Sequence, residues 1–440
     1  MAEAAAQELK RASTQISKLV VSPLLRTQQS AEPIAELFKV EPVTDEQIIE
    51  PYNMFEGRKV SAKTVLLRPH LVFHLRNPLK PSWGESYVSV VSRMMKAMTE
   101  AGFLSALIPE EFGGAGLPLR AACVILEEIH ACGGNASATH AQMYTMGTVL
   151  RHGSPEQKQR YLPKIASGEL RLQAFGVTEP TTGTDTTKLK TRAVRDGDHY
   201  VINGQKIWTS RALYSDLMLL LARTTPLEQV TKKTDGLSVF LVDMRQAVGH
   251  GMTIRPIKAM INHNTTEVFF DNLRIPADSL IGQEGKGLRY IMDGMNAERI
   301  LVSHESLGDA KWFIKTAVNY ANERRVFDRP IGQNQGIQFP IARCYAQMRA
   351  AELMVHHAAQ VYDAGGNPGE EANMAKLLAS EASWAAADMC VQTHGGFGFA
   401  EEYDVERKFR EARLYTVAPI STNLILSYLA EHVLGLPRSY

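Results

Sequence analysis

The sequence predicts an α+β fold in which one strand-rich segment separates two helical ones. Apolar residues recur at three- and four-residue spacings in "YVSVVSRMMKAMTEAGF" and "RAACVILEEIHACG", and they do so again from about residue 286 to the end. Between these stretches, from about residue 171, short β-rich runs alternate with turn signals. No parallel βαβ series stands out, which disfavours a Rossmann nucleotide site.

The chain of 440 residues is longer than one compact core usually supports, and its patterns divide it into four segments. Residues 1–85 mix strand-like and loop-like pieces, and no structure is assigned to them. Residues 86–170 are expected to form an α-helical domain, residues 171–285 a β-domain, and residues 286–440 a helical bundle. The strand-rich runs are "AVRDGDHYVINGQKIW", "DLMLLLAR", "GLSVFLVDM" and "TEVFFDNLRIP".

Composition excludes several classes of protein. The 48 basic and 47 acidic residues nearly cancel, and no polybasic stripe stands out, so we expect no nucleic-acid partner. The richest apolar run, "DLMLLLA", is too short to span a membrane. The four cysteines form no metal-ligand spacing and no disulfide framework, so we expect no metal and a reducing compartment. Glu3 and Glu8 argue against a transit peptide; the cytoplasm or the mitochondrial matrix is expected, not secretion.

Six phrases, taken together and in this order, resemble the acyl-CoA dehydrogenase family. They are "IPEEFGGAGLP", "FGVTEPTTGTD", "NGQKIWTS", "FFDNLRIP", "ERRVFDRPIGQNQ" and "QTHGGFGF". The resemblance covers roughly residues 86–440. It implies an N-terminal helical domain, a central antiparallel β-domain and a C-terminal four-helix bundle. It further implies a homotetramer, or a dimer, that binds FAD at its subunit contacts.

The chemistry of the matched phrases suits a cofactor. A Gly/Thr/Pro loop such as "FGVTEPTTGT" presents backbone N–H groups and hydroxyls, and an arginine binds phosphate with two hydrogen bonds. Each phrase alone has a plainer explanation: a connecting loop, a core tryptophan after a turn at Asn203–Gly204, a solvated ion pair, or a helix cap. By resemblance, the FAD contacts are Phe175, Val177, Thr178, Gly183, Thr184, Trp208, Thr209, Arg324, Phe327, Gln335, Gln392, Gly395, Gly396, Ser421 and Asn423.

Removal of an α-proton from an acyl-CoA requires a base, and the sequence offers Glu298. Many family members carry this glutamate near the C-terminus, where counting from "REARLY" leads here to Pro419. A subgroup that includes isovaleryl-type and long-chain-type enzymes carries it on the first long helix after the β-domain, and "GMNAERILV" matches at Glu298. Met295 and Leu301 put Glu298 beside an apolar stripe, which favours a raised pKa. The alternative is a structural ion pair.

Pro419 also removes a hydrogen-bond donor, because the family holds the thioester oxygen partly with the backbone N–H at this position. Three explanations remain open. Ala418 or Ile420 supplies the N–H instead; a flavin hydroxyl and water suffice for a more acidic substrate; or the protein performs another reaction. The resemblance assigns substrate contacts to Thr184, Asn296 and Arg299.

The resemblance therefore implies an enzyme of fatty acid metabolism. It would convert an acyl-CoA to the 2-enoyl-CoA with Glu298 as base and flavin N5 as hydride acceptor, and electron-transferring flavoprotein would reoxidise it. Two alternatives keep the fold: a flavin-dependent oxidase or monooxygenase, and a non-catalytic FAD-binding relative.

Overall fold

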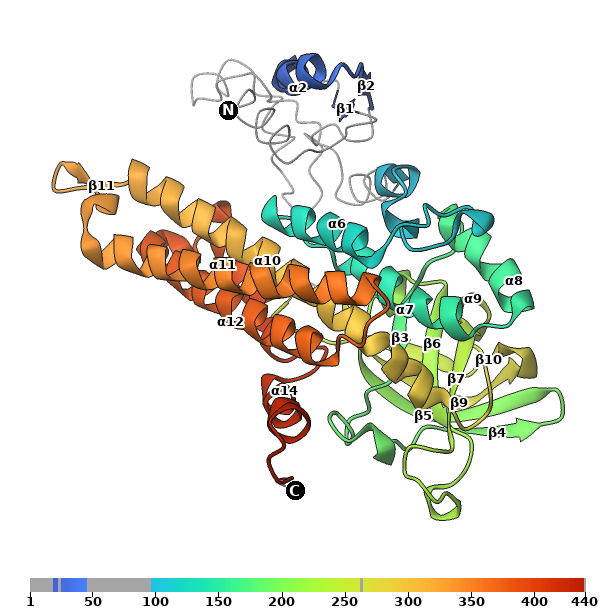
Figure 1. Ribbon diagram of the computed structural model, residues 1–440. Coiled ribbons are helices and arrows are strands. Elements are labelled where there is room, and N and C mark those ends of the chain that lie inside the picture. Colours follow the sequence, from blue (N-terminus) through green and yellow to red (C-terminus); the bar gives the residue numbers. More distant parts are fainter. Residues whose placement is uncertain (1–18, 23–24, 46–95, 262–263, 439–440) are drawn as a thin grey trace, which may run out of the picture. The chain divides into compact units, whose positions relative to one another are not determined.

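The computed structural model describes residues 19–22, 25–45, 96–261 and 264–438, and they fall into two compact units, Met1–Ala101 and Gly102–Tyr440 (Figure 1). In the first unit, β1 (Leu19–Val21) pairs in parallel with β2 (Pro42–Thr44), and α2 (Leu25–Phe38) connects them. Most of the segment left unassigned by sequence, and most of the helix expected over residues 87–103, lie outside the described residues.

The second unit begins with three helices, α6 (Leu119–Ala131), α7 (Ser137–His152) and α8 (Pro155–Ala166). The sequence dictates the start of α8 clearly: the Ser154 hydroxyl accepts from the Gln157 N–H, the Gln157 side chain bonds back to the Ser154 N–H, and Pro155 occupies the first turn. Helix α7 is different, since 10 of its 16 residues are buried, polar ones included, and only Arg151 is exposed. This helix is therefore enclosed by the rest of the unit.

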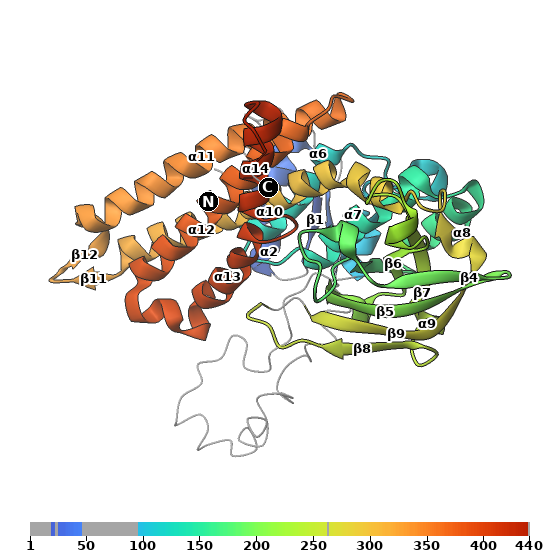
Figure 2. The ribbon, with the colours of Figure 1, turned by 90° about the horizontal axis from the view of Figure 1, so that it is seen from below.

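The central sheet has eight strands in the order β10-β7-β6-β4-β5-β9-β8, and β3 pairs in parallel with β6 (Figure 2). The other pairings are antiparallel apart from a single parallel contact between β4 and β6. The four predicted strand-rich runs all form strands. The bounds are β3 Leu172–Gly176, β4 Arg192–Asp196, β5 His199–Ser210, β6 Leu217–Arg223, β7 Leu237–Asp243, β8 Met252–Pro256, β9 Thr265–Pro276 and β10 Leu280–Ile281.

Strand β6 is buried on both faces because an apolar cluster packs on each of them. Leu217, Leu219 and Leu221 join an apolar cluster with residues of α7 and α8, while Met218 and Leu220 belong to the cluster on the opposite face. This division follows from the two-residue period of a strand. Helices α7 and α10 pack against β3 and β7 respectively, so one face of the sheet meets the helical layer.

The turn expected at Asn203–Gly204 is wrong. Both residues lie inside β5, and the hairpin reverses instead at Gly197, where φ is +60°. Gly204 marks a register shift against β9. A Cβ atom on Gly204 would lie 2.5 Å from Thr191 Oγ1, so the glycine allows a close approach of two chains and makes no turn.

The C-terminal part is helical, as predicted. Its long helices are α10 (Gly287–Glu323), α11 (Gln335–Asp363) and α12 (Gly369–His394), followed by α13 (Val405–Ala412) and α14 (Thr422–Tyr428). Small residues of α12 pack on α10, so the bundle core is rich in alanine. The tip of the bundle, between α10 and α11, carries the two-residue strands β11 (Arg325–Val326) and β12 (Arg329–Pro330) (Figures 1 and 2).

Candidate active site

Glu298 lies in the first third of α10 and is almost fully buried, with 8% of its surface exposed. Burial raises the pKa of its carboxyl group to about 6, while the positive charges of His140 and Arg299 limit the rise. None of the described residues donates a hydrogen bond to this carboxylate or forms an ion pair with it at contact distance. The alternative reading, a structural ion pair, therefore finds no partner among the described residues.

Two side chains of α7 face this part of α10. His140 Nδ1 lies 3.4 Å from Glu305 Oε2, one heptad beyond Glu298. The ring of Tyr144, one turn further along α7, contacts the ring of His140 at 5.2 Å between centroids. Tyr144 also meets Phe175 of β3 edge to face at 5.2 Å. These contacts connect α10 to the strand from which the predicted flavin loop departs.

The predicted flavin loop, residues 177–185, is fixed by a buried ion pair. Lys206 Nζ on β5 lies 2.8 Å from Glu179 Oε1 and donates to the Val177 carbonyl at 3.0 Å. Glu179 also accepts from the backbone N–H groups of Lys190 and Thr191 at 2.6 and 2.9 Å. The loop is thus held from both of its ends. Its Gly183 and Thr184 are exposed.

Trp208 and Thr209 have features that an ordinary strand does not explain. Trp208 has a φ of +60°, sits in a register shift of β5, and exposes 58% of its surface. Thr209 is fully buried, and its hydroxyl has no partner among the described residues. A large aromatic face beside an unsatisfied hydroxyl fits a flat, polar-edged group such as an isoalloxazine.

The predicted substrate contacts do not all meet. The Arg299 guanidinium donates to Asn296 Oδ1 at 2.8 Å, and Arg299 Nε has no partner among the described residues. Arg299 is buried, which lowers its pKa, and it lies near Tyr428 and Lys376 toward α14 and α12. Thr184 is exposed on the flavin loop, and no contact joins it to the other two.

The segment around Pro419 narrows the choice of a hydrogen-bond donor. The Ala418 N–H is used, because it donates to the Leu414 carbonyl at 2.9 Å. The Ile420 N–H makes no hydrogen bond within the described part of the chain. The Ile420 carbonyl accepts from Lys376 Nζ at 2.8 Å, and this lysine is fully buried in α12. Ser421 caps α14 by accepting from the Leu424 N–H, and Asn423 is exposed.

A second group of predicted FAD contacts lies at the tip of the bundle. Arg324 ends α10, and its guanidinium stacks on Phe397 at 5.6 Å, next to Gly395 and Gly396. Phe327 is 93% exposed. From the rise of an α-helix, Arg324 lies about 39 Å along α10 from Glu298. The members of this tip group are Arg324, Phe327, Gln335, Gln392, Gly395 and Gly396, and they cannot reach the Glu298 end of the same chain.

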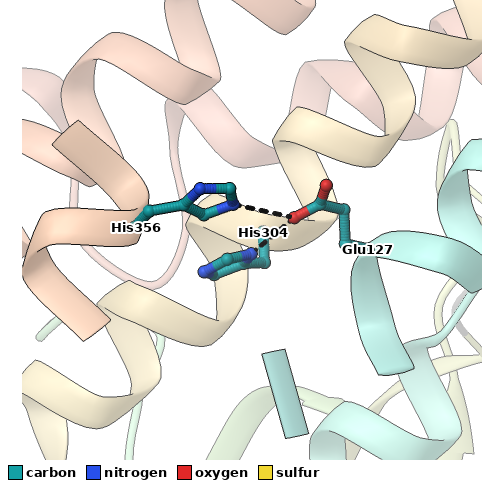
Figure 3. A group of neighbouring side chains, drawn as sticks. All are labelled: Glu127, His304 and His356. Carbon is teal, nitrogen blue, oxygen red and sulfur yellow. Dashed lines mark hydrogen bonds and ion pairs between the residues drawn. The ribbon is translucent and has the colours of Figure 1, made fainter. Parts of the chain in front are cut away.

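Figure 3 shows a group formed by two buried residues, Glu127 of α6 and His304 of α10, and the exposed His356 of α11. Their nitrogen and oxygen atoms are close enough to bind a metal ion. The carboxylate is already satisfied, however: Oε2 is 2.6 Å from His304 Nδ1, and Oε1 is 2.6 Å from Lys311 Nζ. Lys311 also pairs with Glu352 at 2.7 Å. The ammonium group balances the local charge, so we interpret the group as an ion-pair network between helices.

Sequence reasoning missed several groups around the site: His140, Tyr144, Glu305, Lys206, Glu179 and Lys376. They lie on four different elements, and no phrase of the sequence joins them. A signal does exist in α7, where His140 and Tyr144 recur at a four-residue spacing in a helix with few large apolar residues.

Comparison with known proteins agrees with this architecture. The family models for the N-terminal, middle and C-terminal domains of acyl-CoA dehydrogenases match residues 77–169, 174–273 and 285–434. The model of the histidine phosphatase superfamily (branch 1) matches residues 1–102, which coincides with the first compact unit.

Three relatives illustrate the similarity. Acyl-CoA dehydrogenase FadE12 of Mycobacterium tuberculosis is 36% identical over 342 residues, 77% of this chain and 87% of that protein. The caffeyl-CoA reductase-Etf complex subunit CarC of Acetobacterium woodii is 32% identical, over 74% of this chain and 85% of CarC. The solved glutaryl-coenzyme A dehydrogenase complex with glutaryl-CoA superposes with a TM-score of 0.73 at 29% identity, over 87% of this chain and 98% of that one.

Proposed function

The chain belongs to the acyl-CoA dehydrogenase family, and on this premise we propose that it oxidises an acyl-CoA thioester to the 2-enoyl-CoA with Glu298 as the catalytic base. The observation that carries the proposal is the state of Glu298. Its carboxylate is buried, it has no hydrogen-bonded partner in the described part of the chain, and its pKa is raised to about 6. A carboxylate of this kind is ionised at neutral pH yet basic enough to take a proton from carbon.

The residues around Trp208 fit the cofactor of the family. FAD, when bound, supplies the acceptor for the hydride that leaves the β-carbon. The Trp208 face and the orphaned Thr209 hydroxyl would bind it, and the Glu179–Lys206 ion pair holds the adjoining loop in place. Phe175, Val177, Thr178, Gly183 and Thr184 on that loop, with Ser421 and Asn423 at the start of α14, remain proposed FAD contacts.

The structure favours one replacement for the donor lost at Pro419. Of the two neighbouring N–H groups, that of Ala418 donates to the Leu414 carbonyl, and that of Ile420 makes no hydrogen bond to any residue that the structure describes. We therefore assign the thioester oxygen to the Ile420 N–H, whose orientation depends on the Lys376 bond to the carbonyl of the same residue. Asn296 and Arg299 would contact the substrate as a hydrogen-bonded pair.

The same chain cannot complete its own cofactor site. The tip group lies far from Trp208 and Glu298, so we propose that a second copy contributes it, in a homotetramer or a homodimer. Large apolar side chains lie exposed along α11, among them Phe339, Tyr345 and Leu353, as a subunit contact requires.

Electron-transferring flavoprotein is the proposed acceptor of the electrons. The supporting observation is the relative CarC, which is a subunit of a complex with Etf. The relatives described above come from bacteria, and we propose the cytoplasm as the compartment. None of the helices in the described ranges is long and apolar enough to cross a membrane.

The test is anaerobic mixing of the purified flavoprotein with a panel of acyl-CoAs. We expect at least one to bleach the flavin absorbance, Glu298→Gln to abolish the bleaching, and kcat/KM to rise with pH through about 6 as Glu298 loses its proton. If no acyl-CoA bleaches the bound flavin, the proposed reaction is wrong. Rapid turnover with oxygen as the only acceptor would indicate an oxidase or a monooxygenase instead.

A further inference from the structure

A buried cluster of ionisable groups lies around the part of α10 that follows Glu298. It has no role in the reaction described so far. It contains Glu305 and Asp309 of α10, His130 of α6, His140 of α7 and Lys408 of α13. Each of these side chains is almost fully inaccessible to solvent. Buried charges are costly unless they are paired, so the protonation states of this cluster follow from its contacts.

Burial lowers the pKa of His130 and the Asp309 carboxylate raises it, with a net rise, but the hydrogen bonds of the ring fit only its neutral form. Its Nε2 accepts a hydrogen bond from the Ala136 backbone N–H at 3.0 Å, which requires a lone pair on that nitrogen. Its Nδ1 therefore carries the proton and donates to Asp309 Oδ1 at 2.7 Å. Asp309 is in turn paired with the ammonium of Lys408, which also donates to the Gly134 carbonyl at 2.9 Å. This half of the cluster is balanced by itself.

Glu305 must then obtain its positive partner from His140. The Glu305 carboxylate lies 3.7 Å from His130 Nε2, too far for a hydrogen bond, and 3.4 Å from His140 Nδ1. The Tyr415 hydroxyl also faces Glu305 but brings no charge, because burial raises its pKa well above the usual range. Burial by itself lowers the pKa of His140, but the interactions with Glu305 and the charge of Glu298 together outweigh burial and raise it. His140 is thus the cation of this half of the cluster.

His140 acts on two carboxylates of α10: it pairs with Glu305, and its charge also favours ionisation of Glu298. Glu298 and Glu305 are one heptad apart on α10, so they share a face and lie about 10 Å apart along the axis. Glu305 Oε2 lies 3.4 Å from His140 Nδ1, and His140 Nε2 is buried without a partner among the described residues. We propose, on the basis of the proposed function, that His140 is a positioning residue that keeps the base Glu298 ionised at neutral pH.

The charged and titratable groups that face Glu298 are few. They are His140 and Tyr144 on α7, and Arg299 and Glu305 on α10. Tyr144 is neutral, because burial raises the pKa of its hydroxyl far above the usual range. Glu305 opposes ionisation of Glu298, and Arg299 and His140 favour it, His140 more strongly. Loss of the imidazolium therefore leaves Glu298 with one cationic neighbour and an opposing carboxylate.

The experiment compares His140→Gln with the wild-type flavoprotein. In the variant, we expect the pH at which Glu298 ionises to rise by about 1 unit or more. It is measured as the carboxyl band of Glu298 in infrared difference spectra against Glu298→Gln, recorded on the resting protein without substrate. The acid limb of kcat/KM should move by the same amount. His140→Lys restores a cation and should keep the ionisation near the wild-type pH.

His152→Gln is the matched control, since His152 lies on the same helix, pairs with Asp293 at 3.1 Å and stacks on Tyr290. It should leave the ionisation of Glu298 unchanged. The smaller variant His140→Asn carries the same expectation as His140→Gln and replaces it if that variant does not fold. An unshifted carboxyl band in the neutral variants, or an equal shift in His140→Lys, overturns the proposal. Because the infrared measurement needs no turnover, it gives its result even if no acyl-CoA reduces the flavin.

Discussion

At the scale of single residues, the site depends on ionisable side chains that are buried away from water. Glu298 has no hydrogen-bond donor among the described residues, and its burial raises its pKa. Lys376 shows the opposite case: burial lowers its pKa to about 8, and its ammonium still binds the Ile420 carbonyl at 2.8 Å. Burial of a lysine ammonium group costs free energy, and here the group binds a backbone carbonyl. We therefore expect that the orientation of the Ile420 peptide matters to the protein.

The variant Lys376→Met tests this reading. Without the bond to its carbonyl, the Ile420 peptide loses its fixed orientation, and we expect kcat to fall by about 10- to 100-fold with a smaller change in KM. Steady-state kinetics with a dye acceptor measure both constants. Lys311→Met is the control, because Lys311 pairs with Glu127 and Glu352 away from Ile420 and should change stability more than kcat. Equal kinetic effects of the two variants would contradict the role of Lys376.

At the scale of elements, the sheet and the helices contribute different things. The register shift in β5 exposes Trp208, while Lys206, two residues earlier, points inward and ties the flavin loop to the sheet. The Ile207 N–H also donates to the Thr178 carbonyl at 2.9 Å. A single strand therefore both presents a candidate cofactor contact and fixes the loop beside it.

Replacement of Lys206 by methionine should destabilise the protein by about 3–5 kcal/mol, because the Glu179 charge would remain buried without its partner. We also expect weaker retention of FAD, since the loop at Val177 would lose its anchor. Denaturant unfolding and flavin release measure the two effects. The double variant Lys206→Met/Glu179→Gln should recover part of the stability; strictly additive losses would show that the two side chains do not interact energetically.

At the scale of the whole molecule, the predicted cofactor contacts form two groups that one chain cannot join. The group at β5 and the flavin loop lies beside the start of α10, and the tip group lies beyond its end (Figure 1). Residues 1–102, in contrast, match the histidine phosphatase model, which overlaps the acyl-CoA dehydrogenase N-terminal model over residues 77–102, and we assign no activity to them.

Mixed oligomers test the sharing of sites between subunits. Arg324→Ala and Glu298→Gln should each be inactive alone, the first through loss of FAD contacts. After co-expression, about half of the pairs should be mixed, and one of the two sites in each mixed pair regains both residues. We therefore expect activity to return to about a quarter of the wild-type level. Activity with a dye acceptor and flavin content measure the recovery. Its absence, with mixed oligomers demonstrated by mass spectrometry, would show that Arg324 serves its own chain.

The sequence by itself determined the order of helices, sheet and helices, because the apolar periods of 3.6 and 2 are local properties of the chain. It also identified the family, through phrases such as "FGVTEPTTGTD" and "QTHGGFGF", and it singled out Glu298 and the missing donor at Pro419. The turn at Asn203–Gly204 was wrong, because an Asn-Gly pair can also lie in a strand where another chain approaches closely.

Only the tertiary structure decided which charges face one another. His140 and Glu305 lie far apart in the sequence, as do Lys206 and Glu179 and also Lys376 and Ile420, and none of these pairs has a local signature. Burial, which sets the pKa of Glu298, likewise arises when α7, α10 and the sheet pack together. The sequence thus named a base, whereas the packing of distant elements determines whether that base is charged at the pH of the reaction.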